Sequence, residues 1–517
     1  MKNIHVPTLI ILGGSIFCFS TQYFELANTI QRCWTGGSAI LLLIYYFAMV
    51  CLGKCVTLPK DQIMKTLCIL GILEIIFSII QLFGLLPDNY KYAHFSGSLN
   101  NPAIFGMLLS FCVPVSVYFL KYTDGKEKTL WKFLFVIFAV FIILSDSRTA
   151  ILASACGALS VLLMMEKNLF REKLKKRKFK FLTFIFIVLT FVFLYFYKRD
   201  SAEGRFLIWN VCVEMIKEKP LWGWGTDGFY AHYMNYQAEY LKSHAGSPFA
   251  LLADETQNPF NEFLHIAIVC GVPCCLFFIG IIIGTIWYLC NRRIEHCEVL
   301  LGLTLVFVVW CMFCYPLTTP FVWMILSFIA LSMISLETLP KPCHAVIFVM
   351  CLFCLFLMVK NGYANIRRVS LQEYAMNNHD IQVMNKYESM YREMSSNGLF
   401  LYNYAAMLHL NGDYEKSITV FKECSAYIND YNMMLLMGDN YQQMDIPDSA
   451  IVYYKRASEM IPNRFLPLYY QMAVYQEQGN NNKAKEIAEI IVHKENKIKK
   501  SKTVNEIIKR ANECLRE

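Results

Sequence analysis

The sequence predicts an all-α fold, in which a polytopic membrane helix bundle of about 11–12 transmembrane helices precedes a soluble α-solenoid. Of its 517 residues, 56% are hydrophobic and 17% are charged, against roughly 45–50% and 25% in soluble domains. Apolar residues form blocks of about 16–25 residues as far as Val359, and from Lys360 the chain is polar. We therefore expect a membrane domain over 1–360 and a water-soluble domain over 361–517.

The apolar blocks are long enough to cross the hydrocarbon core of a membrane, which takes about 17–25 residues per helix. We expect about eleven spans, at residues 6–22, 38–53, 66–86, 101–120, 130–145, 149–166, 179–197, 260–290, 298–315, 320–337 and 343–359. The block 260–290 is too long for one straight crossing, so it should be tilted, broken or partly re-entrant. The first block lacks a small-residue cleavage site and is taken as an uncleaved helix.

Basic residues in alternate loops predict the orientation of the bundle. With a cytoplasmic amino terminus, the inside loops carry most of the Lys and Arg, including the run "REKLKKRKFK". The positive-inside rule therefore puts the loop 198–259 and the polar tail outside. The net charge of +8 comes largely from the inside loops, which favours contact with anionic membrane lipid over binding of nucleic acid.

The loop 198–259 is much longer than an ordinary connection, and its tryptophans and glycines indicate order. The segment "AEGRFLIWNVCVEMIKEKP" predicts an amphipathic helix that ends at Lys219 and Pro220. Its apolar residues recur at three- and four-residue steps: Phe206, Trp209, Val213 and Ile216. We expect this helix to lie along the membrane surface, with Arg205 at its start.

The polar tail repeats internally. Similar units begin at Asn411, Met444 and Gln478, which are 33 and 34 residues apart, and a further unit begins at Asn378. A turn, then a small residue and another small or aromatic residue four positions later, resembles tetratricopeptide repeats. We expect three or four helix pairs and a terminal helix near 502–515. Such a surface binds a protein or a glycan, unless it is only a folded cap.

Four polar clusters fall on the predicted outside face, where groups near lipid indicate a functional site. The first, "FSGSLNNPAIFG", holds Asn100 and Asn101; the alternative is a plain helix start with an Asn cap and Pro102. The second, "SDSRTA", holds Ser147 and Arg148. Arg148 is either satisfied by the nearby Asp146 or suited to a phosphate ligand.

The third cluster combines Arg205 and Trp209 with "PLWGWGTDGF", in which Gly225 allows close backbone approach and Asp227 supplies a carboxylate. A glycine-rich turn alone is a weak signal.

The fourth cluster is "NPFNEFLHIAIVCGVP", which holds Asn258, Asn261, Glu262 and His265. Asn261 and His265 are one helical turn apart, so both can face one cavity. The alternatives are stabilisation of a helix start by Glu262 and a hydrogen-bonded histidine inside the bundle.

Taken together and in this order, the four motifs resemble the O-antigen ligase family of polytopic glycosyltransferases, over about Phe95–Pro273 by motif and 1–360 by topology. That family transfers a glycan from a polyprenyl diphosphate to an acceptor hydroxyl in the periplasm, without a nucleotide sugar or an obligatory metal. The resemblance implies a bacterial inner-membrane enzyme with the tail in the periplasm, an undecaprenyl-diphosphate-linked glycan as donor, and no cofactor or metal. The implied acceptor is the lipid A core of lipopolysaccharide or a protein Ser or Thr.

By the same resemblance, Arg148 and Arg205 hold the carrier diphosphate as it becomes the leaving group. Family members usually place a His directly before the Asn of the fourth motif, and here that position is Phe260. The candidates for a base are therefore Glu262 and His265, then His244, Asp254 and Glu255. The predicted catalytic residues are Glu262, Arg205 and Arg148; the predicted substrate-binding residues are Asn100, Asn101, Ser147, Trp209, Gly225, Asp227, Asn258, Asn261 and His265.

Two alternatives stay open. A surface-polysaccharide polymerase of the same fold differs only in its acceptor. A scaffold that displays the repeats, or a transporter of lipid-linked glycan, needs no catalysis. The repeats favour a protein acceptor or a protein partner.

Overall fold

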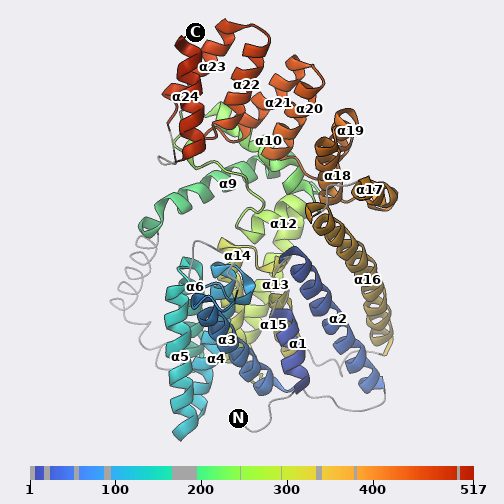
Figure 1. Ribbon diagram of the computed structural model, residues 1–517. Coiled ribbons are helices and arrows are strands. Elements are labelled where there is room, and N and C mark those ends of the chain that lie inside the picture. The colour runs from blue at the N-terminus through green and yellow to red at the C-terminus, as the bar shows by residue number, and fades with distance from the viewer. Residues whose placement is uncertain are drawn as a thin grey trace. The chain divides into compact units, whose positions relative to one another are not determined.

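The computed structural model describes eleven stretches of the chain, and all regular structure in them is helical (Figure 1). They are residues 6–16, 24–51, 58–86, 95–165, 195–244, 246–292, 294–333, 341–377, 381–495, 497 and 501–516. The chain forms two compact units. Unit 1 comprises Met1–Leu194, Phe260–Glu262 and Phe277–Ser370; unit 2 comprises Tyr195–Pro259, Phe263–Leu276 and Leu371–Glu517.

Unit 1 is a bundle of apolar helices. They are α1 (Val6–Ile16), α2 (Phe24–Cys51), α3 (Lys60–Leu82), α4 (Pro102–Tyr122), α5 (Gly125–Leu144), α6 (Arg148–Met165), most of α13 (Val272–Asn291), α14 (Cys297–Phe313), α15 (Pro320–Met333) and most of α16 (Lys341–Asn377), with short 3-10 turns η1 (Gly97–Leu99) and η2 (Pro316–Thr318). Five of the described helices are long and apolar enough to cross a membrane: α3, α4, α6, α13 and the part of α16 over Phe348–Met376. The chain is thus a multi-pass membrane protein by length and composition of its helices.

The predicted block 260–290 is broken, one of the forms expected for it, because Gly271 adopts a φ of +87° between α12 (Glu262–Cys270) and α13. The helices deviate from the predicted spans in two other places. Helix α2 begins well before residue 38, and α16 continues past Lys360 into polar sequence. Most of the predicted span 179–197 and the basic run before it lie outside the described residues.

The core of unit 1 is centred on α4, where Phe105, Leu108 and Phe111 are fully buried. Small residues let α6 and α14 approach it closely. A Cβ added at Gly157 of α6 would lie 2.6 Å from Val306, and one at Gly302 of α14 would lie 2.9 Å from Pro114 of α4. Close approach through small residues is the usual packing of membrane helices, because burial against lipid-like side chains gives little driving force.

The C-terminal part of unit 2 is a series of helical hairpins: α17 (Ile381–Met394), α18 (Gly398–Asn411), α19 (Tyr414–Cys424), α20 (Tyr431–Gln443), α21 (Pro447–Met460), α22 (Leu466–Glu477), α23 (Asn481–His493) and α24 (Lys502–Arg516). The starts of α17, α19, α21 and α23 are 33, 33 and 34 residues apart. The period expected from the sequence is therefore also the period of the helices. Assignment to tetratricopeptide repeats stays a prediction.

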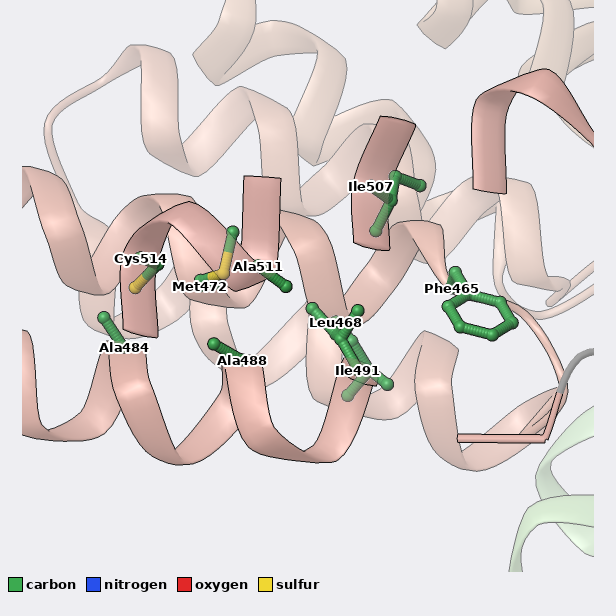
Figure 2. Packing of buried hydrophobic residues seen from close by; sticks show 9 residues of the cluster. All are labelled: Phe465, Leu468, Met472, Ala484, Ala488, Ile491, Ile507, Ala511 and Cys514. Atoms are coloured by element: carbon green, nitrogen blue, oxygen red, sulfur yellow. The ribbon is translucent and has the colours of Figure 1, made fainter. Parts of the chain in front are cut away.

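The last helix, α24, covers the end of this series at the place where a terminal helix was expected. Figure 2 shows its Ile507, Ala511 and Cys514 packed beside Ala484 and Ala488 of α23, with α22 completing the cluster. The alanines keep the helices close, and the buried apolar side chains hold the end of the series together.

The long loop folds against these hairpins as α9 (Arg199–Glu218), α10 (Gly228–Ser243) and α11 (Phe249–Leu252). The fully buried Gln237 of α10 donates to the carbonyl of Met460, at 2.8 Å. Arg456 of α21 donates to Asn235 Oδ1 at 2.9 Å and to Glu239 at 2.8 Å. The loop is therefore ordered, as its tryptophans and glycines indicate, and contacts with the hairpins hold it in place.

Helix α9 ends where predicted. On the apolar face that was expected to lie along the membrane surface, Phe206 and Val213 are exposed. The buried face is a second apolar stripe: Leu207, Ile208, Val211, Cys212 and Met215. This stripe is buried because α9 packs against α10 and α11, which the periodicity of α9 alone does not reveal.

Candidate functional site

The first two motifs come together in unit 1, at the N-terminal ends of α4 and α6. Asn101 caps α4 by accepting hydrogen bonds from the N–H groups of Ala103 and Ile104, and Pro102 follows as the first helical residue. A Cβ added at Gly106 of α4 would lie 2.9 Å from Ser145 Oγ, in the hairpin before α6. Two helix N-termini therefore lie close together, and both favour negative charge.

Arg148 is the first residue of α6 and is half-buried. Ser147 accepts a hydrogen bond from the N–H of Ala150 at 3.3 Å, so it stabilises the same helix start. Asp146 adopts a φ of +54° in the tight hairpin and acts electrostatically on the Arg148 guanidinium. The cation is thus placed at a helix N-terminus, where backbone N–H groups also favour an anion, and Asp146 would compete with such an anion for it.

Glu74 is a site residue that the sequence reasoning missed. It is fully buried in α3, and its carboxylate accepts hydrogen bonds from the N–H of Ser98, at 2.8 Å, and from the Ser98 hydroxyl. A Cβ at Gly97, whose φ is +62°, would collide with the same carboxylate. An acid in the apolar run "CILGILEIIFSII" is the signal that could have found it, because ionisable groups inside membrane spans are costly.

The fourth motif crosses between the units: Asn258 and Pro259 belong to unit 2, and the next residues, Phe260–Glu262, belong to unit 1 at the C-terminal end of α14. Asn261 donates from Nδ2 to the carbonyl of Met312 at 3.3 Å. Phe260 packs against Tyr315, with ring centroids 5.7 Å apart, and adopts a φ of +50°. A left-handed backbone is rare for a bulky residue and stores strain. Glu262 follows as the buried first residue of α12.

Helix α14 ties this end of the bundle to the first motif, because Trp310 donates to Ser110 of α4 at 2.9 Å. Six predicted site residues therefore belong to unit 1: Asn100, Asn101, Ser147, Arg148, Asn261 and Glu262. They include an arginine at a helix N-terminus and one buried carboxylate. A cation can stabilise a departing phosphate, and a carboxylate can take up a proton.

The third motif and the rest of the fourth come together in unit 2. The N–H groups of Trp224 and Gly225 donate to the carbonyls of Ile268 and Val269, at 2.7 and 3.1 Å. The glycine-rich turn thus satisfies the last carbonyls of α12, which have no partner within the helix. Gly223 has a φ of +68°, which favours glycine, and a Cβ at this position would lie 2.5 Å from the carbonyl oxygen of Ile268.

Six predicted residues lie in unit 2: Arg205, Trp209, Gly225, Asp227, Asn258 and His265. Trp209 donates from Nε1 to the carbonyl of Pro259 at 3.0 Å, so α9 is tied to the second residue of the fourth motif. Arg205, Asn258 and His265 are half-buried, and Asp227 is exposed at the start of α10.

The other candidate bases also lie in unit 2. His244 follows the end of α10 and is hydrogen-bonded to Ser243 and to the carbonyl of Tyr240. Asp254 forms an ion pair with Arg464 at 2.8 Å. Burial, together with the neighbouring Asp430, raises the pKa of Glu255 to about 7. Within the described ranges, no three His, Cys, Asp or Glu side chains are grouped as metal ligands would be.

Comparison with known proteins agrees with these motifs. The family model described as O-antigen ligase matches residues 133–279, which include the second, third and fourth motifs. A search of curated proteins finds no match for the chain. Over the matched segment the chain is similar to O-antigen ligases, which supports a multi-pass membrane enzyme with an activity of the glycosyltransferase type.

Proposed function

We propose that the protein transfers a glycan from an undecaprenyl-diphosphate carrier to an acceptor hydroxyl on the periplasmic face of the inner membrane. The observation that carries this proposal is the meeting of the α4 and α6 N-termini at Arg148, of which α6 lies within the segment similar to O-antigen ligases. The acceptor is the lipid A core or a Ser or Thr side chain of a protein.

In the proposed reaction, the acceptor oxygen forms a bond to the anomeric carbon of the glycan as the bond to the carrier diphosphate breaks. The diphosphate leaves with the electron pair, and the cation of Arg148 stabilises its negative charge. We assign Glu262 as the group that takes the acceptor proton. Two observations support this role: Glu262 is buried directly after Asn261, and the residue before Asn261 is Phe260 rather than a histidine that could act as the base.

Arg205 is the second proposed phosphate-binding cation and is tested separately, because it lies in unit 2. Purified protein is incubated with lipid-linked glycan and three acceptors: lipid A core, a serine-rich protein and free glycan. We expect Arg148→Ala and Arg205→Ala to reduce transfer about 100-fold or more, the scale of losing one stabilising group in a transition state.

Each arginine has a matched control. Arg199 lies on the same helix as Arg205 but is exposed and paired with Glu203 at 2.6 Å. Arg292 is an exposed arginine just beyond the end of α13. Arg199→Ala and Arg292→Ala should retain transfer. If wild-type protein transfers glycan to none of the acceptors, the scaffold or transporter alternative is correct; transfer to free glycan alone identifies a polymerase.

A further inference from the structure

Unit 2 contains a cavity between the long loop and the first hairpins, with a volume of about 580 Å³. This is within the roughly 300–1,000 Å³ of small-ligand sites. One wall is formed by α10 and residues 255–257, and the other by α18 and its flanking turns. All of these residues belong to the same compact unit, so the cavity depends on the folding of that unit alone.

The lining of the cavity combines aromatic faces with hydrogen-bonding groups. Phe229, Tyr230 and Tyr233 come from α10, and Phe229 stacks on Tyr233 with centroids 4.7 Å apart. Tyr402 and Asn403 come from α18 on the opposite wall. Aromatic rings bind the C–H faces of a ligand, while phenol and amide groups bind its polar edges.

Two carboxyl groups meet in this cavity. Glu255 Oε2 accepts a hydrogen bond from Asn432 at 3.1 Å, and Asp430 accepts one from Tyr402 at 3.5 Å. Burial raises the pKa of both acids, that of Glu255 to about 7. The two side chains are hydrogen-bonded to each other, so a proton on either acid provides a donor beside several acceptors.

The charges around the cavity exclude an anionic ligand. No Lys, Arg or His is among its described lining residues, while Asp227, Glu255 and Asp430 are. The nearby Arg464 is engaged by Asp254 at 2.8 Å. A phosphate or a uronic acid would meet three acidic side chains and no cationic one among the described lining residues, and like charges repel one another.

We propose that this cavity binds an uncharged or amine-bearing saccharide, with its hydroxyls on Glu255 and Asp430 and its C–H face on the aromatic rings. The choice of a saccharide over another hydroxyl-rich ligand rests on the proposed glycan transfer. The sugar comes either from the donor glycan or from a glycan acceptor, and the chemistry of the cavity suits both.

The test measures binding of two oligosaccharides to the full chain in detergent micelles by isothermal titration calorimetry. One is released by mild acid from the host's lipid-linked glycan, and the other is the core oligosaccharide released from its lipid A. We expect one of them to bind, and Glu255→Gln and Asp430→Asn to weaken it about tenfold or more. Asp430→Asn keeps the helix cap that Asp430 gives Met433, because Asn caps as well.

The matched control is Asp448→Asn, in a separate recess of the same hairpins; it should leave binding unchanged. Binding of neither oligosaccharide, equal binding by all variants, or preferential binding of a serine-rich peptide overturns the proposal. Transfer kinetics distinguish a failure of the saccharide-site proposal from a failure of the proposed function. Wild-type protein that binds saccharide without transferring it refutes the function alone, whereas normal transfer and an unchanged KM in Glu255→Gln refute the saccharide site alone.

Discussion

Replacing Glu74 tests whether a buried acid holds the first motif in place. In Glu74→Leu, the N–H and the hydroxyl of Ser98 lose their acceptors in a position where Ser98 is 3% exposed. A hydrogen bond to a charged group contributes about 1.5–3 kcal/mol to stability. Part of this loss is offset because the variant no longer buries an acidic group, which is unfavourable. We expect a net destabilisation of about 2–4 kcal/mol.

Glu74→Gln separates the hydrogen bonds from the charge. The Gln carbonyl can accept from the Ser98 N–H, and its amide can donate to the Ser98 hydroxyl oxygen. This variant should therefore lose only about 1 kcal/mol.

Once the exposed thiols, such as Cys270, Cys274 and Cys354, have been blocked, heating the detergent-solubilised protein with a thiol-reactive dye measures the difference, because Cys68 and Cys112 are buried between α3 and α4 and label only on opening. Glu74→Leu should label at a temperature several degrees lower than Glu74→Gln. Equal midpoints for wild type and Glu74→Leu, or for the two variants, would show that these hydrogen bonds do not stabilise the bundle.

Three further predictions concern the loop and the fourth motif. Gly271→Ala places a Cβ against the Leu221 carbonyl at a φ of +87°, so it should open the α12 end and speed proteolysis after Trp222; an unchanged cleavage rate contradicts this. Burial, with smaller contributions from Asp430 and Asp254 and an opposing one from Arg464, raises the pKa of Glu255 from 4.5 to about 7. Its contribution to stability is therefore full below pH 4.5 and is lost as pH rises through 7. Pulse proteolysis should show a slope of at most about 1.4 kcal/mol per pH unit, reduced by partial exposure, that flattens in Glu255→Gln. Phe260→His suits the left-handed backbone and should raise the transfer rate about 100-fold if proton removal is limiting; initial rates beside Phe260→Leu decide this.

Helix positions and the membrane class were predictable because they depend on local pattern. Asn101 and Pro102 predicted the start of α4, and the 33-residue step predicted the starts of α19 and α21. Apolar blocks predicted multiple membrane helices, since length and hydropathy are properties of a single segment.

Long-range contacts were not predictable in this way. The structural role of Glu74 depends on its hydrogen bonds with Ser98, which lies on a different element, and the sequence does not reveal that contact. The buried stripe of α9 was not predicted, because two apolar stripes run along this helix and only the packing of α10 and α11 shows which one is buried in the protein. From the sequence, Glu255 is only an acidic residue of the long loop; the structure shows that Asp430, far along the chain, lies beside it and helps to raise its pKa.

The contact between the loop and the hairpins also constrains how the protein is made. Gln237 and its acceptor Met460 are 223 residues apart, so synthesis at about 5–20 residues per second separates them by roughly 10–45 s. During that interval α10 has been made but lacks the surface that will cover it. A chain truncated before α21 would keep the loop in that state permanently. Loss of transfer on deleting the hairpins would therefore report a misfolded loop, even if no hairpin residue touches the substrate.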